Sequence, residues 1–122
     1  MRNVIIHNLS NPTADPILAG YCDTTWCRFL GLMFRPRLKK GTGLLLVENK
    51  ESRAAASIHM MFMRFDICAV WINNDFKVVD AKLAKRWAPV YSPSAPARYI
   101  LETHTYFLSD FQIGDRLEFK DA

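Results

Sequence analysis

Five polar residues stand in or beside apolar segments of the chain, and their side chains could do chemistry. They are Arg35, His59, Arg64, Asp66 and Glu102. Because imidazole titrates near neutral pH, His59 with Asp66 or Glu102 could act as a general acid and base. An arginine side chain could hold a carboxylate or a phosphate through two parallel hydrogen bonds.

The same side chains have a simpler structural interpretation. A buried charge needs a partner to tolerate burial, so Arg64 could form an ion pair with Asp66 or with Glu102. Structural ion pairs perturb the pKa values of charged groups just as active sites do, so such groups do not by themselves indicate catalysis. We therefore favour the structural role. If a barrel closes around these residues, some of them would meet at one mouth, and all are candidates for binding a ligand.

Residues 59–63 combine an imidazole with several thioether groups. On a strand, His59, Met61 and Met63 would face the same way. Such soft ligands suit copper(I), and Cys68 could join them from a neighbouring element. Methionine also fills irregular gaps in apolar cores. We therefore predict a Met-rich core wall without a metal, with copper binding as the alternative, and the sequence identifies no other cofactor.

The chain has three cysteines, Cys22, Cys27 and Cys68. An odd count in a chain that is not cysteine-dense argues against a disulfide framework. The C-x4-C spacing of the first two matches neither the redox C-x-x-C pattern nor half of a usual zinc site. We expect both to pack as small hydrophobic residues. The sequence also contains no phosphate-binding loop and no serine nucleophile elbow.

The composition is that of one soluble globular domain over residues 1–122, with 50% hydrophobic and 23% charged residues. The net charge is +4, and basic residues gather in residues 35–40 and 82–86. Nucleic-acid binding needs a basic face interleaved with stacking aromatic residues. Because the charge excess is modest, we do not expect a nucleic-acid partner. The sequence leaves the oligomeric state open.

Two patterns that the sequence lacks bear on where in the cell the protein is expected. No apolar run approaches the roughly 18 residues that a membrane-spanning helix needs. Residues 1–9 lack the apolar stretch of roughly 7–15 residues and the cleavage site that mark an export signal. A cytoplasmic location is therefore the default expectation. A natural form from which a signal has been removed would look the same, so export stays open as the alternative.

Apolar alternation and turn residues predict a strand-rich domain. The expected strands span residues 3–9, 18–22, 43–47, 66–72, 76–84, 98–103 and 116–120. Asp23 or Thr24 could cap a short helix that ends near Gly31. A further helical turn is expected over residues 106–111. About seven short strands indicate a mainly β (β-rich α+β) domain, either a closed or nearly closed barrel or a sandwich.

The spacing also predicts which side chains share a face. In the first helix, residues 26, 30 and 33 would form one buried stripe. In the strand over residues 76–84, Phe76, Val78 and Asp80 would lie on one side, because successive strand residues point to opposite faces.

Several ordered motifs of this chain together form a pattern. Residues 31–35 read G-L-M-F-R, and residues 58–65 read I-H-M-M-F-M-R-F. An apolar strand, a hairpin, an L-E segment and a closing G-D turn follow at residues 43–47, 69–79, 99–102 and 114–115. Over residues 20–119 the chain thereby resembles the uncharacterised bacterial and archaeal family called domain of unknown function 192. The resemblance implies a small, β-rich, barrel-like domain, and it implies no reaction because the family has no established one.

The chain departs from the family pattern after the central motif. Family members commonly have Pro followed two residues later by Asp, whereas these positions hold Asp66 and Cys68 here. The resemblance therefore implies that a functional carboxylate of the family is either missing from this chain or moved to Asp66.

The function predicted from the sequence is a small binding or accessory module. Its ligand would be a small polar or anionic molecule, or a protein partner, at a site lined by the five polar residues named above. The alternative is an enzyme, a hydrolase or isomerase that uses His59 with a carboxylate, and soft-metal binding is a third interpretation. An enzyme would hold the catalytic pair within hydrogen-bond reach in an open cleft, whereas a binding module would have a pocket without such a pair.

Overall fold

Seven strands and two short helices make up the described part of the chain, residues 2–122 of a computed structural model. The strands are β1 (Asn3–Asn8), β2 (Ile17–Cys22), β3 (Thr42–Ser52), β4 (Ile67–Ile72), β5 (Val78–Ala84), β6 (Ala97–Thr103) and β7 (Leu117–Asp121). The helices are α1 (Thr25–Leu30) and the 3-10 helix η1 (Thr105–Asp110). Each of the expected strands and both expected helical segments is present within a few residues of its predicted bounds.

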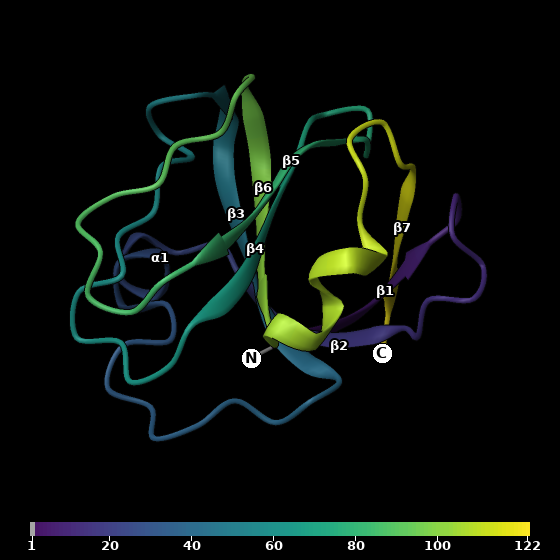
Figure 1. Ribbon diagram of the computed structural model, residues 1–122. Helices are drawn as coiled ribbons and strands as arrows, with labels where there is room; N and C mark the ends of the chain where they lie inside the picture. The colour runs from purple at the N-terminus through teal and green to yellow at the C-terminus, as the bar shows by residue number, and fades with distance from the viewer. Residues whose placement is uncertain (1) are drawn as a thin grey trace.

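The strands form one sheet in the order β5-β4-β6-β3-β2-β1-β7. All neighbours are antiparallel except β2 and β3, which are parallel. The sheet curls until its two edge strands meet at one end, where Lys77 bridges Arg116 and the Val78 N–H donates to the Asp115 carbonyl at 2.8 Å. Figure 1 shows this half-closed barrel, and it confirms the mainly β, barrel-like prediction.

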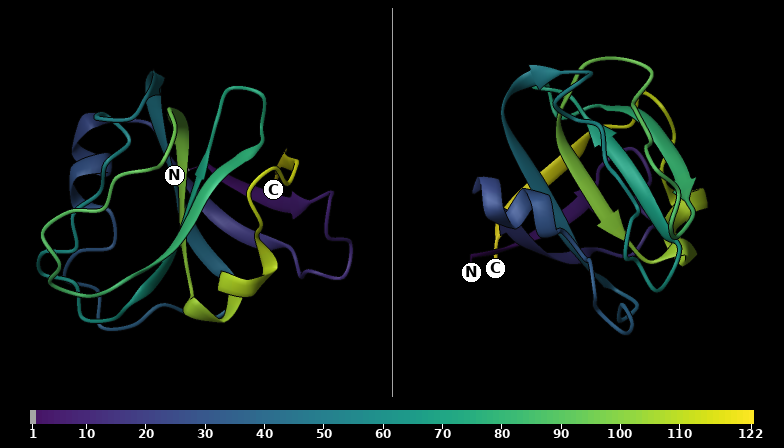
Figure 2. Two further views of the ribbon diagram at one scale, coloured as in Figure 1. Left: turned by 45° about the horizontal axis from the view of Figure 1, so that its top comes forward. Right: turned by 90° about the vertical axis from the view of Figure 1, so that its left-hand side faces the viewer.

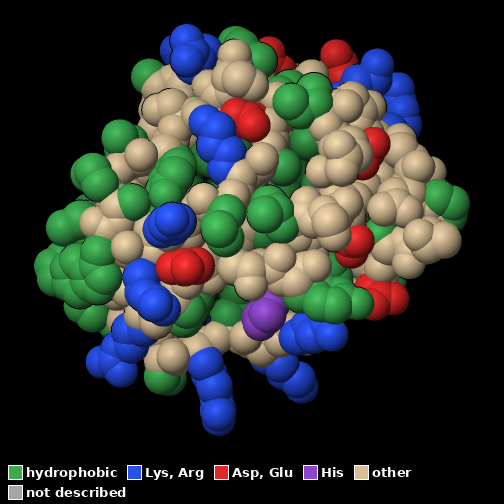
Figure 3. Space-filling view, in the orientation of Figure 1, with side chains coloured by type: hydrophobic (Ala, Val, Ile, Leu, Met, Phe, Trp, Pro, Cys, Tyr) green, Lys and Arg blue, Asp and Glu red, His purple; other side chains and the backbone are tan. Residues whose placement is uncertain are grey.

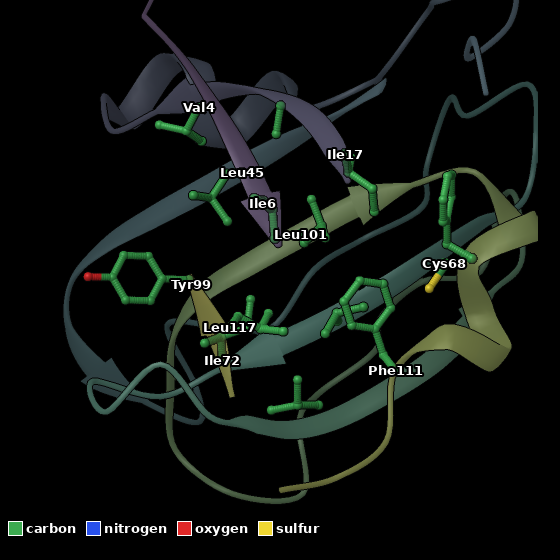
Figure 4. Packing of buried hydrophobic residues seen from close by; sticks show 14 of the residues in the cluster. Val4, Ile6, Ile17, Leu45, Cys68, Ile72, Tyr99, Leu101, Phe111 and Leu117 are labelled. Atoms are coloured by element: carbon green, nitrogen blue, oxygen red, sulfur yellow. The ribbon is translucent and has the colours of Figure 1, made fainter. Parts of the chain in front are cut away.

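One apolar cluster fills the inside of the curled sheet. Alternate residues of β1, β3 and β4 point into it, among them Ile6, Leu45 and Val70, each almost fully buried. Phe107 of η1 and Phe111 close the open side of the curl. Figure 4 shows Ile6, Leu45 and Phe111 among the side chains that converge between the strands. This inner cluster is the barrel core that strand alternation predicts.

A second apolar cluster covers the outer face of β3, β4 and β6. Leu46, Trp71 and Ile100 point outward into it, and the loop residues Met60 and Met63 pack onto them. The indole N–H of Trp71 donates to the Ala56 carbonyl at 2.7 Å, which ties the loop over residues 53–66 to the sheet. As a result every residue of β4 is buried, and the sheet is a layer between two cores. Figure 2 shows α1 and several loops on one side of the central strands and η1 on the other.

Helix α1 begins and ends where the sequence predicts, but its buried stripe is absent. The Thr24 hydroxyl accepts from the Cys27 N–H at 3.1 Å, and the Gly31 N–H donates to the Cys27 carbonyl at the other end. No residue of α1 is buried, and Trp26 is 69% exposed. A helix of six residues is too short to press a full stripe onto the sheet, so it lies at the rim of the outer cluster.

The expectation that Cys22 and Cys27 are free thiols is wrong. They form a disulfide that joins the end of β2 to α1, and the buried Cys68 is the free cysteine. The chain turns from the strand into the helix so sharply that the two Cα atoms lie 5.6 Å apart, a usual span for a disulfide. Counting cysteines could not detect a bridge between residues this close in sequence.

The predicted alternation in β5 is also wrong, because the strand contains a bulge. Val78 pairs with Ile72 and Asp80 pairs with Trp71, so Val79 is an extra residue. Val78 therefore faces the inner cluster, whereas Asp80 lies opposite Trp71 of the outer cluster. One unpaired residue moves the side chain of every later residue of the strand to the opposite face of the sheet. None of the helices within residues 2–122 has the length and apolar character needed to cross a membrane.

Candidate functional site

A cavity of about 250 Å³ lies on the outer face of the sheet. Its floor includes Leu46 of β3 and Ile100 of β6. Helix α1 and the turn after it form one wall, and residues 55–63 form the opposite wall. This volume is just below the range typical of pockets for drug-sized ligands, so the cavity suits a small molecule.

Glu102 is the buried acidic group of this cavity. It comes from β6, its side chain is almost fully buried, and its Oε1 atom has no hydrogen-bond partner among residues 2–122. Burial raises the pKa of Glu102 to about 7, and the nearby guanidinium of Arg35 lowers it in part. Near neutral pH the carboxyl group can therefore donate a proton to a hydrogen bond or carry a negative charge.

Gly31 allows the backbone to approach this carboxyl group closely. It has φ 49° and ψ −125°, a conformation that side chains with a Cβ avoid. A Cβ atom at this position would also come within 3.3 Å of Glu102 Oε1. The glycine therefore both ends α1 and leaves room beside the unpartnered oxygen.

An ion pair between Arg28 and Glu48 lines the same cavity and holds α1 to β3. The Arg28 Nε lies 3.2 Å from Glu48 Oε2, and both side chains are largely buried. The Arg28 guanidinium also donates to the carbonyls of Asp23 and Val47, at 2.8 and 3.0 Å. Burial raises the pKa of Glu48, and Arg28 partly offsets this. The hydrogen-bonding capacity of Arg28 is thus largely used within the protein.

His59 lines the cavity opposite α1. Its Nδ1 atom accepts from the Met61 N–H at 3.3 Å, and its Nε2 atom lies 3.4 Å from the Phe29 carbonyl. The imidazole also packs against the ring of Phe29, with 5.8 Å between centroids. Both ring nitrogens are engaged by backbone groups. His59 therefore connects the loop to α1 and makes no hydrogen bond to Glu102.

The other predicted site residues lie outside this cavity. Arg35 and Arg64 are exposed, although Arg35 is close enough to act on the charge of Glu102. Asp66 accepts from the Arg86 N–H at 2.9 Å and lies in a separate hollow with His104. Of the five candidates, the structure thus brings together His59 and Glu102, with Arg35 nearby. The expected ion pairs of Arg64 with Asp66 or Glu102 do not form.

The candidate ligands for a soft metal are also separated. Cys68 belongs to the inner cluster and Met63 to the outer cluster, so the sheet lies between them. Met61 is 37% exposed, because residues 59–63 form a loop with a positive φ at Phe62 and not a strand. Within residues 2–122, no group of three or more His, Cys, Asp or Glu side chains could hold a metal ion.

Sequence reasoning missed three residues of the site: Arg28, Gly31 and Glu48. Gly31 is the expected end of the helix, but its contact with Glu102 depends on a strand far away in the chain. Arg28 and Glu48 belong to none of the motifs that the sequence contains. The position of Glu48 directly after the apolar residues 43–47 was the available signal.

Comparison with known proteins places the chain among uncharacterised relatives. A UPF0127 protein of Pyrococcus furiosus is 39% identical over 100 residues, which cover 80% of this chain and 83% of that protein. A UPF0127 protein of Thermococcus kodakarensis is 44% identical over 80 residues, which cover 66% of this chain and 49% of that protein. The matched part thus spans about half the length of the Thermococcus protein.

Two crystal structures share the fold. A Sinorhizobium meliloti protein, provisionally named a transcription regulator, matches with a TM-score of 0.84 at 18% identity, covering 97% of this chain and 92% of its own. A Novosphingobium aromaticivorans protein of unknown function matches with a TM-score of 0.77 at 18% identity, covering 95% and 83%. The family model DUF192, described as "Uncharacterized ACR", matches residues 7–119 and so begins before the expected residue 20. The protein therefore belongs to the family called domain of unknown function 192.

Proposed function

We propose that the protein is a small binding module that holds a small polar ligand in the cavity beside α1. The observation that carries the proposal is Oε1 of Glu102, a buried hydrogen-bonding atom at the cavity wall that has no partner within residues 2–122. Leaving such an atom unpaired costs free energy, about 1–3 kcal/mol, that a ligand donating a hydrogen bond would recover.

The charges around the cavity favour a neutral or cationic ligand over an anion. The guanidinium of Arg28 is already bound to Glu48 and to two backbone carbonyls. Arg35 and Arg64 are exposed. An anion in the cavity would therefore face the carboxyl group of Glu102 without a free buried cation. A ligand with an amine, amide or hydroxyl group would meet a suitable acceptor.

Binding is better supported than acid–base catalysis. A His–carboxylate pair needs a nitrogen of the imidazole within reach of the carboxyl group or the substrate. Both ring nitrogens of His59 are engaged by backbone groups instead. The enzyme alternative would require the loop carrying His59 to rearrange first.

The proposal can be tested by NMR titration with methylammonium, acetamide and acetate as probes. At about pH 8, above the pKa of Glu102 of about 7, methylammonium should shift the amide signals of residues 29–33 and 57–63. Acetamide should do the same more weakly, and acetate should not. Native mass spectrometry of the freshly purified protein would identify any ligand that it retains.

The variant Glu102→Gln should lose the response to methylammonium, because the amide removes the negative charge. Glu118→Gln changes a partly exposed carboxylate on β7 in the same way and should keep the response. If the amide signals of the cavity residues stay unchanged with all three probes, the proposal is contradicted. A response that survives in Glu102→Gln would contradict it as well.

A further inference from the structure

Three aromatic residues form an exposed surface beside the cavity. Phe34, Phe62 and Trp87 come from three different loops, and 57%, 46% and 54% of their surfaces are exposed. We call them the aromatic ledge. The ring of Phe62 lies between the other two, with centroid distances of 5.2 Å to each. Side chains distant in sequence thus form one apolar face.

The backbone holds these rings outward at some cost. Phe34, Phe62 and Trp87 have φ of 65°, 60° and 67°, and within residues 2–122 only one other non-glycine residue, Phe76, has a positive φ. Bulky residues avoid this region. The Phe34 N–H donates to the Phe62 carbonyl at 3.1 Å, and the Trp87 N–H donates to the Met60 carbonyl at 2.7 Å. A strained backbone that leaves large rings about half exposed supports the hypothesis of a functional surface.

The apolar surface continues onto α1. Trp26 and Phe29 are exposed and stack on each other, with 6.1 Å between centroids, and Phe29 contacts His59. Figure 3 shows hydrophobic side chains gathered on the left of the molecule, where in Figure 1 loops lie in front of α1. Large exposed apolar patches on a soluble chain mark surfaces that contact a partner or a membrane.

Basic residues border the ledge. Arg35 follows Phe34, Arg64 is two residues after Phe62, and Lys85 and Arg86 precede Trp87. All four are exposed, and the carboxylate of Asp66 in this region is already engaged by Arg86. Figure 3 shows Lys and Arg side chains at the lower left, next to the hydrophobic group. The surface therefore combines apolar rings with positive charge.

We propose that this surface attaches the protein reversibly to a membrane that contains anionic phospholipid. Trp and Phe side chains insert at the boundary between headgroups and acyl chains, and Lys and Arg are attracted to anionic headgroups. Single-stranded nucleic acid fits less well, because bases stack on free ring faces and these rings pack against one another. The inference is independent of the ligand proposed for the cavity.

Two tryptophans on this surface allow a direct test. Vesicles of phosphatidylcholine, with or without phosphatidylglycerol, are mixed with the protein and sedimented. The protein should sediment with the anionic vesicles, less at high salt, and the fluorescence of Trp26 and Trp87 should shift to the blue. Trp71 is fully buried and should contribute a constant signal. The variant Trp26→Phe isolates the response of Trp87.

Matched variants distinguish vesicle binding through this surface from nonspecific binding. Glycine accepts a positive φ without a steric penalty, so Phe62→Gly and Trp87→Gly remove the rings and keep the backbone conformation allowed. Each should weaken vesicle binding about tenfold, whereas Ile113→Gly, at an exposed residue of another turn, should not. Arg64→Glu should weaken binding to anionic vesicles, and Lys50→Glu on β3 should have little effect.

Three results would overturn the proposal. The first is a wild-type protein that stays in solution with anionic vesicles at low salt. The second is vesicle binding that is equal in Phe62→Gly and in Ile113→Gly. The third is binding to an oligothymidylate, or self-association, that depends on Trp87 in the absence of vesicle binding, which would assign the surface to another partner.

Discussion

At the scale of single residues, Glu102 determines how the site depends on pH. Its pKa of about 7 lies above the ordinary value of 4.5, because burial penalises the charged form. The folded state therefore binds this proton more tightly than the unfolded state. The resulting stability is complete below about pH 4.5, where Glu102 is protonated in both states, and it is lost as the pH rises through about 7.

The substitution Glu102→Gln should remove this pH dependence. At about pH 8 the free energy of unfolding should rise by about 2–3 kcal/mol, because an amide need not be ionised in the buried site. Near pH 5 it should change little. Urea unfolding of both proteins at the two pH values measures the difference. If Glu102→Gln is destabilising by the same amount at both values, the carboxyl group titrates normally.

At the scale of elements, α1 is a lightly attached wall of the cavity. None of its residues is buried, so it contributes little apolar burial. Its attachments include the disulfide to β2, the bonds of Arg28 to Glu48 and to the Val47 carbonyl, and the contact of Phe29 with His59. The helix also lies in the crossover that the parallel pair β2 and β3 requires. Its position therefore depends on a few specific bonds.

Breaking the disulfide should loosen α1 more than the sheet. Reduction, or Cys27→Ser, should lower the free energy of unfolding by about 2 kcal/mol, a value expected for a short closed loop. Hydrogen exchange should accelerate at the amides of Arg28 and Gly31 and stay slow in β4. The double variant Cys22→Ser with Cys27→Ser should not respond further to reductant. Equal exchange of α1 before and after reduction would contradict this account.

At the scale of the whole molecule, aromatic residues support the end where the sheet nearly closes. The rings of Phe76, Tyr99 and Phe119 meet there, with centroid distances of 5.6, 5.3 and 5.1 Å. Tyr99 belongs to β6 and Phe119 to β7, and Phe76 precedes β5. The cluster therefore connects both edges of the sheet to its centre.

Removing one ring of this cluster should weaken the closure. Phe119→Ala should lower the free energy of unfolding by about 2–3 kcal/mol, less than a fully buried phenylalanine would, because the ring is only partly buried. Ile113→Ala, at an exposed residue of the preceding turn, is the control and should change it by less than about 0.5 kcal/mol. Guanidinium unfolding measures both. Equal effects would mean that the aromatic cluster does not support the closure.

The sequence was sufficient to predict where the strands and helices lie. It was not sufficient to predict which face each side chain points to or which segments pair. Strand alternation and turn residues predicted seven strands, because each strand has at least one buried face. The bulge at Val79 and the bridge between Cys22 and Cys27 left no local signal. Glu102 could be identified, since a carboxylate in the apolar segment of β6 is conspicuous. Its contact with Gly31 could not be predicted, because that contact depends on how distant segments of the chain pack together.

The pairing of β1 with β7 has a consequence for how the chain folds. Val4 lies opposite Asp121 and Asn8 opposite Leu117, so the first and last strands are direct neighbours. Forming this pair closes a loop of nearly the whole chain, which is entropically costly and makes folding slow, in the range of milliseconds to seconds. During synthesis β1 must wait for the final strand, and until then one of its edges offers unpaired backbone groups to other chains.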